Sequence, residues 1–185
     1  MRLEIRLAGF GGQGIIRAGL IIAMAASIHS DKNAVQTQSY GPESRGGACK
    51  SEVVISDDDI DFPKITEPDV LITMSQQAYD LYVQTVKKGG TLLFDSSLVK
   101  EEQAAQDIRV FRIPATRIAE EVGKTIVANV VMLGALASIT NVVNADAIKK
   151  SILSNIPKGT EDLNVTAFKR GYDYGQKLVT QSKTA

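Results

Sequence analysis

The amino-terminal residues carry the feature that most limits the folds open to this chain, because a strand, a glycine-rich turn and an apolar helix follow one another there. Residues 2–8 alternate polar and apolar side chains, as in a half-buried β-strand. The chain then reads Gly9-Phe10-Gly11-Gly12-Gln13-Gly14, and an apolar segment of helical length follows at 15–28. Gly9, Gly11 and Gly14 have the spacing G-x-G-x-x-G. A phosphate-binding turn requires this order of strand, glycine loop and helix.

The rest of the sequence repeats an α/β rhythm. Apolar and alternating runs predict strands at 33–40, 50–56, 70–74, 91–94 and 109–113, and helices at 76–87, 116–122 and 127–139. Two further helices follow, and Asn144 is placed to cap the first of them. No repeat or long linker divides the 185 residues, so we expect one domain over 1–185. The predicted fold class is α/β: a three-layer, Rossmann-like domain with a mostly parallel sheet and helices on both faces.

Composition excludes several kinds of function. The 21 basic and 21 acidic residues cancel, which disfavours nucleic-acid binding. The apolar runs are too short or too interrupted to cross a bilayer, and no signal segment precedes the first strand, so we expect a cytoplasmic protein that binds no membrane. Cys49 is the only cysteine and His29 the only histidine. An iron–sulfur cluster needs about four thiolates and a structural zinc site needs several Cys or His ligands, so we expect no metal site and no catalytic residue in this chain.

The glycine loop leaves alternatives open. A nicotinamide site should have an acidic residue at the end of the second strand, to hold the ribose. That strand ends at Tyr40 without a carboxylate, and Asp31 lies before it, at the wrong end. Three other interpretations of the glycine loop remain: a site for another phosphate or diphosphate group, a loop that faces a partner, and a tight turn that only allows helix and strand to pack. Gly11, Gly12 and Gln13 are the candidate binding residues here.

A second loop is expected at 41–47, where one proline and three glycines suit neither helix nor strand. Within it, the guanidinium of Arg45 can make a bidentate contact with a phosphate. Ser44 precedes that arginine, Gly46 and Gly47 would expose backbone N–H groups beside it, and Lys50 follows a few residues on. The alternative is that Arg45 pairs with Glu43 or Glu52 on the surface.

Weaker candidates follow other strands. Asp95-Ser96-Ser97 and Ser75-Gln76 lie where ligands of open α/β sheets gather. Asn129 is polar within an apolar helix and needs a partner if buried, either backbone or ligand. We expect Cys49 to be a small, half-buried residue rather than a reactive thiol, and His29 to be a surface or capping residue.

Taken together, these motifs resemble the gamma subunit of 2-oxoacid:ferredoxin oxidoreductases. The resemblance rests on the glycine hexad, on Gln38-Ser39-Tyr40-Gly41-Pro42-Glu43-Ser44-Arg45-Gly46-Gly47, and on Ser51-Glu52-Val53-Val54-Ile55-Ser56. It continues through 60–63, 74–76, 114–116 and 129–135, and so covers roughly residues 1–140. The stretch over 43–56 is most similar to the 2-oxoglutarate enzymes. The pyruvate, 2-ketoisovalerate and indolepyruvate enzymes are the alternatives.

The resemblance implies a reaction in which a 2-oxoacid, coenzyme A and oxidised ferredoxin give acyl-CoA, CO₂ and reduced ferredoxin. Thiamine diphosphate, Mg²⁺ and iron–sulfur clusters are expected in alpha and beta subunits and a ferredoxin-like delta subunit, with external ferredoxin as acceptor. This chain would help to bind coenzyme A at a shared site through Gly11, Gly12, Gln13, Ser44, Arg45, Gly46 and Gly47, and would be inactive alone. A stand-alone nicotinamide dehydrogenase and a pure scaffold are the other hypotheses.

Overall fold

The computed structural model describes residues 1–40, 48–101 and 107–182, and its six strands form one sheet. The strands are β1 (Arg2–Phe10), β2 (Asn33–Tyr40), β3 (Ala48–Ser56), β4 (Val70–Thr73), β5 (Thr91–Asp95) and β6 (Arg109–Ile113). The helices are α1 (Ile15–His29), α2 (Gln76–Tyr82), α3 (Ala115–Val122), α4 (Ala128–Thr140), α5 (Ala145–Ser154) and α6 (Glu161–Ser182). Short 3₁₀ segments, η1 (Val83–Thr85) and η2 (Thr125–Val127), follow α2 and precede α4.

The sheet has the strand order β2-β3-β1-β4-β5-β6. The pairs β1–β4, β4–β5 and β5–β6 are parallel, whereas β3 runs antiparallel to both of its neighbours, β1 and β2. Only seven residues separate Tyr40 from Ala48, too few for the crossover that a parallel neighbour needs. The prediction of a mostly parallel sheet is therefore confirmed, with β3 as the strand that departs from it.

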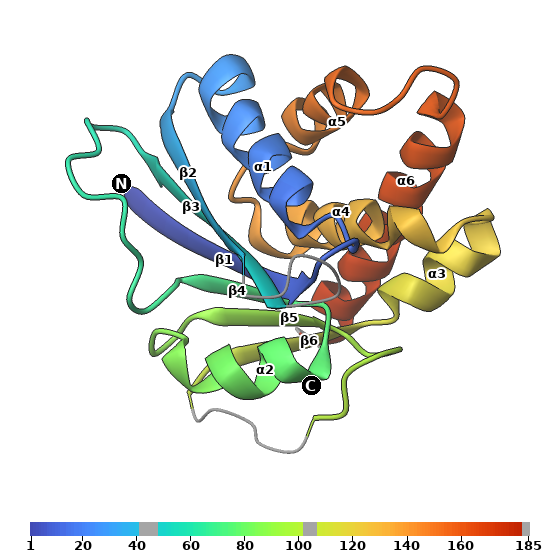
Figure 1. Cartoon of the computed structure of the whole chain (residues 1–185), viewed down its shortest axis with the longest axis horizontal. Helices are drawn as coiled ribbons and strands as arrows, with labels where there is room; N and C mark the ends of the chain where they lie inside the picture. The colour runs from blue at the N-terminus through green and yellow to red at the C-terminus, as the bar shows by residue number, and fades with distance from the viewer. Residues whose placement is uncertain (41–47, 102–106, 183–185) are drawn as a thin grey trace.

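The layers on the two faces of the sheet are unequal. Helices α1, α3, α4, α5 and α6 cover one face and α2 covers the other (Figure 1). The larger core lies under the five helices, and a smaller cluster under α2 contains Leu71, Leu92 and the edge-to-face pair Tyr79 and Phe94, whose ring centroids are 5.5 Å apart. The predicted three-layer architecture is confirmed.

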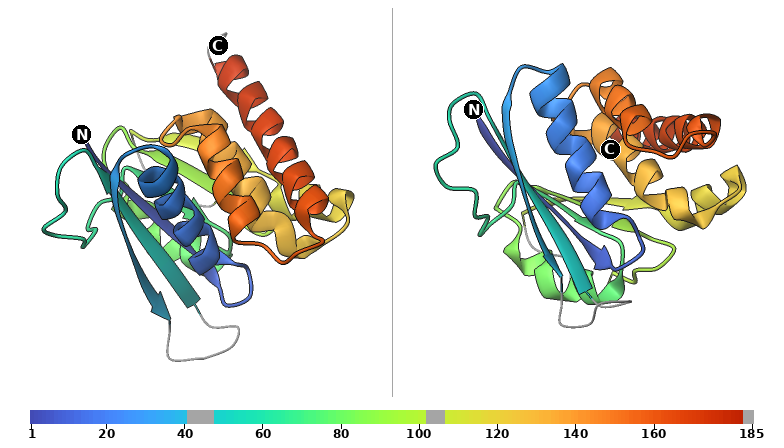
Figure 2. Two further views of the ribbon diagram at one scale, coloured as in Figure 1. Left: turned by 90° about the horizontal axis from the view of Figure 1, so that it is seen from above. Right: turned by 45° about the horizontal axis from the view of Figure 1, so that its top comes forward.

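Helix α4 forms the centre of the thicker layer, and residues 128–139 are all buried. Figure 2 shows α6 beside it, on the same face of the sheet as α1. A Cβ at Gly171 would lie 1.9 Å from the carbonyl oxygen of Val131, and one at Gly134 would lie 2.1 Å from that of Phe168. Glycine at these two positions therefore allows the backbones of α4 and α6 to lie close together.

Element boundaries differ from the sequence prediction in one notable place. The helix predicted over 76–87 ends at Tyr82 and tightens into η1. Two strands have the predicted bounds, Arg109–Ile113 and Asn33–Tyr40. Asn144 caps α5, as predicted, by accepting a hydrogen bond from the backbone N–H of Asp146 at 2.8 Å. Within the described residues, no helix has both the length and the apolar character needed to cross a membrane.

Candidate functional site

The glycine loop joins the end of β1 to the start of α1 and depends on glycine at two positions. Gly14 precedes the helix in the left-handed conformation, with φ of 74°, and a Cβ there would lie 2.3 Å from Nδ2 of Asn129. Gly12 also has a positive φ, of 100°, but faces open space. Gly11 and Gly12 are exposed, so the backbone at the amino-terminal end of α1 is accessible to a ligand.

The side chain of Gln13 holds this loop in place. Its Oε1 accepts a hydrogen bond from the backbone N–H of Phe10, and its Nε2 donates to the carbonyl oxygen of Met74, both at 2.7 Å. Its backbone N–H donates to the carbonyl of Phe10 at 3.2 Å. Of the three residues predicted to bind a ligand here, Gln13 therefore shapes the loop from within, while Gly11 and Gly12 face outward.

Asn129 ties the loop to α4. It is buried, its Nδ2 donates to the carbonyl oxygen of Gly14 at 3.2 Å, and its Oδ1 accepts from the backbone N–H of Val130 at 2.9 Å. The sequence predicted that this residue would need a partner, and both partners are protein backbone. Asn129 is thus a support for the glycine loop.

A cleft of about 530 Å³ opens beside the loop, between the first turns of α1, η2 and the connection from α5 to α6. Gly11, Gly12, Tyr40 and Cys49 also line it. Most of its wall is apolar, made by Ile15, Ile16, Ile21, Val127, Val130, Ile156 and Leu163. The cleft therefore suits a ligand with an apolar body.

Three polar side chains of the cleft have unused bonding capacity. Arg17 and Lys124 are exposed and form no ion pair or side-chain hydrogen bond within the described residues. Asn164 is only 5% exposed, and its Nδ2 donates to the carbonyl oxygen of Thr160 at 2.8 Å. No described group donates to its Oδ1. Among the described residues, the lining contains no acidic side chain, so this part of the cleft favours a ligand with an anionic group and an N–H donor.

The cysteine at the cleft is buried in this chain. Cys49 is 6% exposed, and burial raises the pKa of its thiol. A raised pKa lowers the thiolate fraction at neutral pH, so Cys49 is a poor nucleophile here. His29 is exposed in the last turn of α1, as predicted for a surface or capping residue.

The second predicted binding loop, with Ser44, Arg45, Gly46 and Gly47, lies outside the described residues. Its flanking residues are described: Tyr40 pairs with Cys49, and Phe10 pairs with Ala48. The chain therefore leaves and re-enters the sheet beside the end of β1, where the glycine loop begins.

Glu52 and Lys50, which the sequence linked to this loop, belong to a buried network. Glu52 Oε1 accepts from Arg6 Nε at 2.7 Å, and its Oε2 lies 3.3 Å from Lys50 Nζ. Arg6 also donates to Thr85 Oγ1 and to the carbonyl oxygen of Ile65, and its guanidinium lies 5.0 Å from the Tyr82 ring centroid. Glu52 is buried and has these partners, whereas Arg45 and Glu43 lie outside the described residues, so the alternative that Arg45 pairs with Glu43 or Glu52 stays a prediction. Lys50 faces Tyr82 and not the apolar cleft.

The polar residues after β4 and β5 have structural tasks. Ser75 caps α2 by accepting from the backbone N–H of Ala78. Asp95 is fully buried, and its Oδ2 accepts from the backbone N–H and the hydroxyl of Thr116 at the start of α3. Gln76 donates to the carbonyl of Lys100 and accepts from its N–H. These weaker candidates therefore form structural hydrogen bonds, and Ser75, Gln76 and Asp95 are not among the residues that line the cleft.

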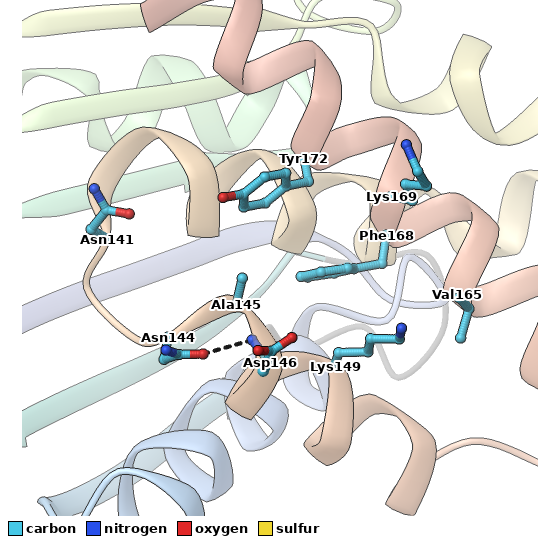
Figure 3. A pocket seen from close by; sticks show the side chains of 9 residues that line it. All are labelled: Asn141, Asn144, Ala145, Asp146, Lys149, Val165, Phe168, Lys169 and Tyr172. Atoms are coloured by element: carbon cyan, nitrogen blue, oxygen red, sulfur yellow. Dashed lines mark hydrogen bonds between the residues drawn. The ribbon is translucent and has the colours of Figure 1, made fainter.

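A second groove, of about 670 Å³, lies between the α4–α5 connection and α6. Figure 3 shows Phe168 and Tyr172 directed into it, with Lys149 and Lys169 on either side. Of the predicted binding residues that the structure describes, Gly11, Gly12 and Gln13, none lines this groove.

The residues that the structure describes form no cluster of metal ligands. Cys49 is the only cysteine in the sequence. Over 1–40, 48–101 and 107–182, no group of three His, Cys, Asp or Glu side chains is placed to hold a metal ion. The chemistry that this arrangement supports is the binding of an anionic ligand with an apolar arm.

The fold is Rossmann-like, with a cleft beside its glycine loop, and comparisons with known proteins place the chain in a family. Residues 4–174 match the model of the pyruvate ferredoxin/flavodoxin oxidoreductase family. The chain is 56% identical over 180 residues to the 2-oxoglutarate synthase subunit KorC of Methanocaldococcus jannaschii, with 96% of each chain covered. The chain belongs to the pyruvate ferredoxin/flavodoxin oxidoreductase family, so the resemblance inferred from the motifs is confirmed, and the chain is a subunit of an oxidoreductase.

Two further relatives show how the domain is used. The gamma subunit of a keto/oxoacid ferredoxin oxidoreductase from Geobacter sulfurreducens is 44% identical, with a TM-score of 0.87 over 96% of this chain and 98% of that one. The ketoisovalerate oxidoreductase subunit VorA of Methanothermobacter thermautotrophicus is 36% identical over 137 residues, which are 74% of this chain but only 28% of that protein. The same unit therefore occurs as a separate subunit and as part of a longer polypeptide.

Proposed function

We propose that this chain is the gamma-type subunit of an enzyme that converts 2-oxoglutarate, coenzyme A and oxidised ferredoxin to succinyl-CoA, CO₂ and reduced ferredoxin. The observation that carries the proposal is the end-to-end identity of 56% to a 2-oxoglutarate synthase subunit. The ketoisovalerate relative is 36% identical over a shorter stretch. Pyruvate, 2-ketoisovalerate and indolepyruvate remain the alternative substrates.

The cleft beside the glycine loop supports a role in binding coenzyme A. Coenzyme A has phosphate groups at one end and a long arm with methyl, methylene and amide groups at the other. The exposed backbone at Gly11 and Gly12 and the cations of Arg17 and Lys124 suit the phosphates. The apolar wall suits the arm, and Oδ1 of Asn164 can accept a hydrogen bond from one of its amides.

Ser44, Arg45, Gly46 and Gly47 are proposed as a second contact with the same ligand. Arg45 has the planar group that binds phosphate in a forked geometry. The residues that flank the loop, Tyr40 and Ala48, lie at the same edge of the sheet as Gly11 and Gly12. A ligand bound at the glycine loop would therefore lie beside the point where this loop leaves the sheet.

Thiamine diphosphate, Mg²⁺ and the iron–sulfur clusters are assigned to partner subunits. One cysteine is too few for a cluster, and the described residues offer no acidic metal site. The proposed partners are alpha and beta subunits, a ferredoxin-like delta subunit and external ferredoxin. In that assembly this chain binds coenzyme A and helps to close the thiamine site, and it holds no redox centre.

Steady-state kinetics of the assembled complex, with coenzyme A varied at saturating 2-oxoglutarate, test the coenzyme A site. Arg45→Ala should raise KM for coenzyme A about ten- to a hundredfold, since one charge-assisted contact contributes about 1.5–3 kcal/mol. Arg45→Lys should recover part of this loss, because an ammonium does not reproduce the forked contact. Arg17→Ala and Lys124→Ala should raise the same KM severalfold, as loss of roughly 1 kcal/mol each would do.

Lys177→Ala is the matched control, because it removes an exposed positive charge from α6, away from the cleft. It should leave KM for coenzyme A unchanged. An unchanged KM in the Arg45, Arg17 and Lys124 variants would refute the proposed site. Failure of the Arg45 variant to assemble would assign that loop to a subunit contact and favour the scaffold hypothesis.

A further inference from the structure

The groove between the α4–α5 connection and α6 is separate from the proposed coenzyme A site. Its volume of about 670 Å³ is within the range of pockets that hold small molecules. Among the described residues, its lining shares no member with that of the glycine-loop cleft. Helix α6 contributes to both, with Leu163 and Asn164 at the cleft and Phe168 and Tyr172 at the groove. A ligand in the groove would therefore occupy a site of its own.

Two aromatic side chains of α6 lie at the centre of the groove. Phe168 and Tyr172 are one helical turn apart, with ring centroids 6.3 Å apart and ring planes inclined by 30°. Phe168 is buried, whereas Tyr172 is half-buried and its ring is directed into the groove (Figure 3). Ala145 and Val165 add apolar surface around them. The centre of the groove therefore suits a planar ring.

One end of the groove is positively charged. Lys149 of α5 and Lys169 of α6 lie at the same end in Figure 3. Lys169 pairs with Asp173 at 2.5 Å, but Lys149 forms no ion pair and no side-chain hydrogen bond within the described residues. An ammonium group without an acidic partner at the rim of a pocket favours an anionic group of the ligand there.

The other end of the groove offers hydrogen-bonding groups. Over 1–40, 48–101 and 107–182, the side-chain amide of Asn141 and the carboxylate of Asp146 form no hydrogen bond or ion pair. The hydroxyl of Tyr172 accepts from Nε2 of Gln176 at 3.2 Å and retains its own hydrogen for donation. Asp146 accepts hydrogen bonds and repels anions, so this end suits an amino group and a ring nitrogen, not a phosphate.

We propose that this groove binds a nucleoside phosphate with an amino-substituted purine base, such as an adenine nucleotide. The base lies against Tyr172, its amino group faces Asp146 and Asn141, and its phosphate lies at Lys149. Inorganic phosphate would leave the aromatic centre empty, and an apolar ring would leave both polar ends without partners. The site goes beyond the proposed function, which assigns coenzyme A to the cleft beside the glycine loop.

Titration calorimetry of the purified full chain with adenosine monophosphate (AMP) tests this site. AMP should bind saturably, at one site per chain. Inosine monophosphate has a carbonyl oxygen in place of the amino group, so it should bind severalfold more weakly, because Asp146 then has no donor. Inorganic phosphate should bind more weakly than either nucleotide. Absence of AMP binding, or equal affinity for AMP and inorganic phosphate, would overturn the proposal.

Substitutions on α5 locate the phosphate. Lys149→Ala should weaken AMP binding severalfold. Lys150→Ala is the matched control, since it removes an exposed charge from the next residue of the same helix, which does not line the groove. It should change the affinity less than twofold. Equal weakening by the two variants, or none by Lys149→Ala, would overturn the proposal. Both lysines are exposed, so neither substitution should prevent folding.

Coenzyme A itself contains an adenine nucleotide, so the groove has to be distinguished from the cleft. Arg17→Ala and Lys124→Ala, which change only the cleft, should leave AMP binding within twofold. Loss of AMP binding in these variants, with none in Lys149→Ala, would place the nucleotide in the cleft and overturn the proposal. An unchanged KM for coenzyme A in the cleft variants would refute the proposed coenzyme A site and leave the groove standing.

Discussion

Replacing Glu52 by alanine should destabilise this domain more than most surface changes. The carboxylate is buried, with a side chain 9% exposed, and it accepts from Arg6, whose side chain is 5% exposed. Without it, Arg6 keeps its bonds to Thr85 and Ile65 but has no other ion pair within the described residues. Lys50 loses the same partner, but its side chain is 30% exposed and can be hydrated.

The magnitude follows from the burial of the remaining charge. Removing one member of a buried ion pair costs about 3–5 kcal/mol, because the other charge stays desolvated. For a domain of this size, about 1 kcal/mol corresponds to roughly 2–4 °C in the unfolding midpoint, so Tm should fall by about 6–20 °C. Substituting both Arg6 and Glu52 with leucine should recover much of this loss, since no unpaired charge is left.

Thermal unfolding of the isolated chain, followed by circular dichroism, measures this effect. Asp173→Ala is the matched control, because it breaks the Lys169–Asp173 pair on the exposed face of α6. That change should cost only about 0.3–0.5 kcal/mol, or roughly 2 °C. If the Tm of the Glu52→Ala variant fell no further than that of the control, the reasoning that Glu52 neutralises a buried Arg6 would be refuted.

Three other predictions concern the thiol, the helix contact and the absence of cofactors. Because burial raises the pKa of the Cys49 thiol, iodoacetamide should alkylate it slowly in the folded chain near neutral pH and rapidly once the chain is unfolded. Fast labelling of the folded chain would contradict this. Gly171→Ala should lower the free energy of unfolding, measured in urea, by about 1–3 kcal/mol, because its Cβ would lie 1.9 Å from the Val131 carbonyl oxygen. The control variant Lys177→Ala should leave this free energy unchanged. The purified single chain should be colourless, because one cysteine cannot hold a cluster, and near-stoichiometric iron and sulfide would refute this.

Local signals in the sequence were sufficient for most of the fold. The alternating run of β1, the glycine turn and the apolar α1 predicted the first βα unit, because each signal depends on neighbouring residues. Ser75 and Asp95 were weaker candidates for ligand binding because of their position after strands, and in the structure each accepts a hydrogen bond from a backbone N–H in the first turn of a helix. Since serine before a helix is also an N-cap signal, the sequence could have suggested the role of Ser75.

The Arg6–Glu52 network could not be predicted in this way. Arg6 is a polar position in an alternating strand, so it is expected to face solvent. The pair brings together residues 46 positions apart, across β1 and β3, under a face that α2 and η1 cover. The apolar cleft is likewise made by segments far apart in sequence, and Arg17, Lys124 and Asn164 became candidates only once the fold had brought them together.

Ferredoxin reduction by the reconstituted complex, assayed with and without this chain, tests the central claim most directly. With all subunits present, turnover should depend on coenzyme A and should be faster with 2-oxoglutarate than with pyruvate or 2-ketoisovalerate. Omitting the chain should abolish coenzyme A-dependent turnover, and adding it back should restore it. Undiminished coenzyme A-dependent oxidation of 2-oxoglutarate by the other subunits alone would contradict the account.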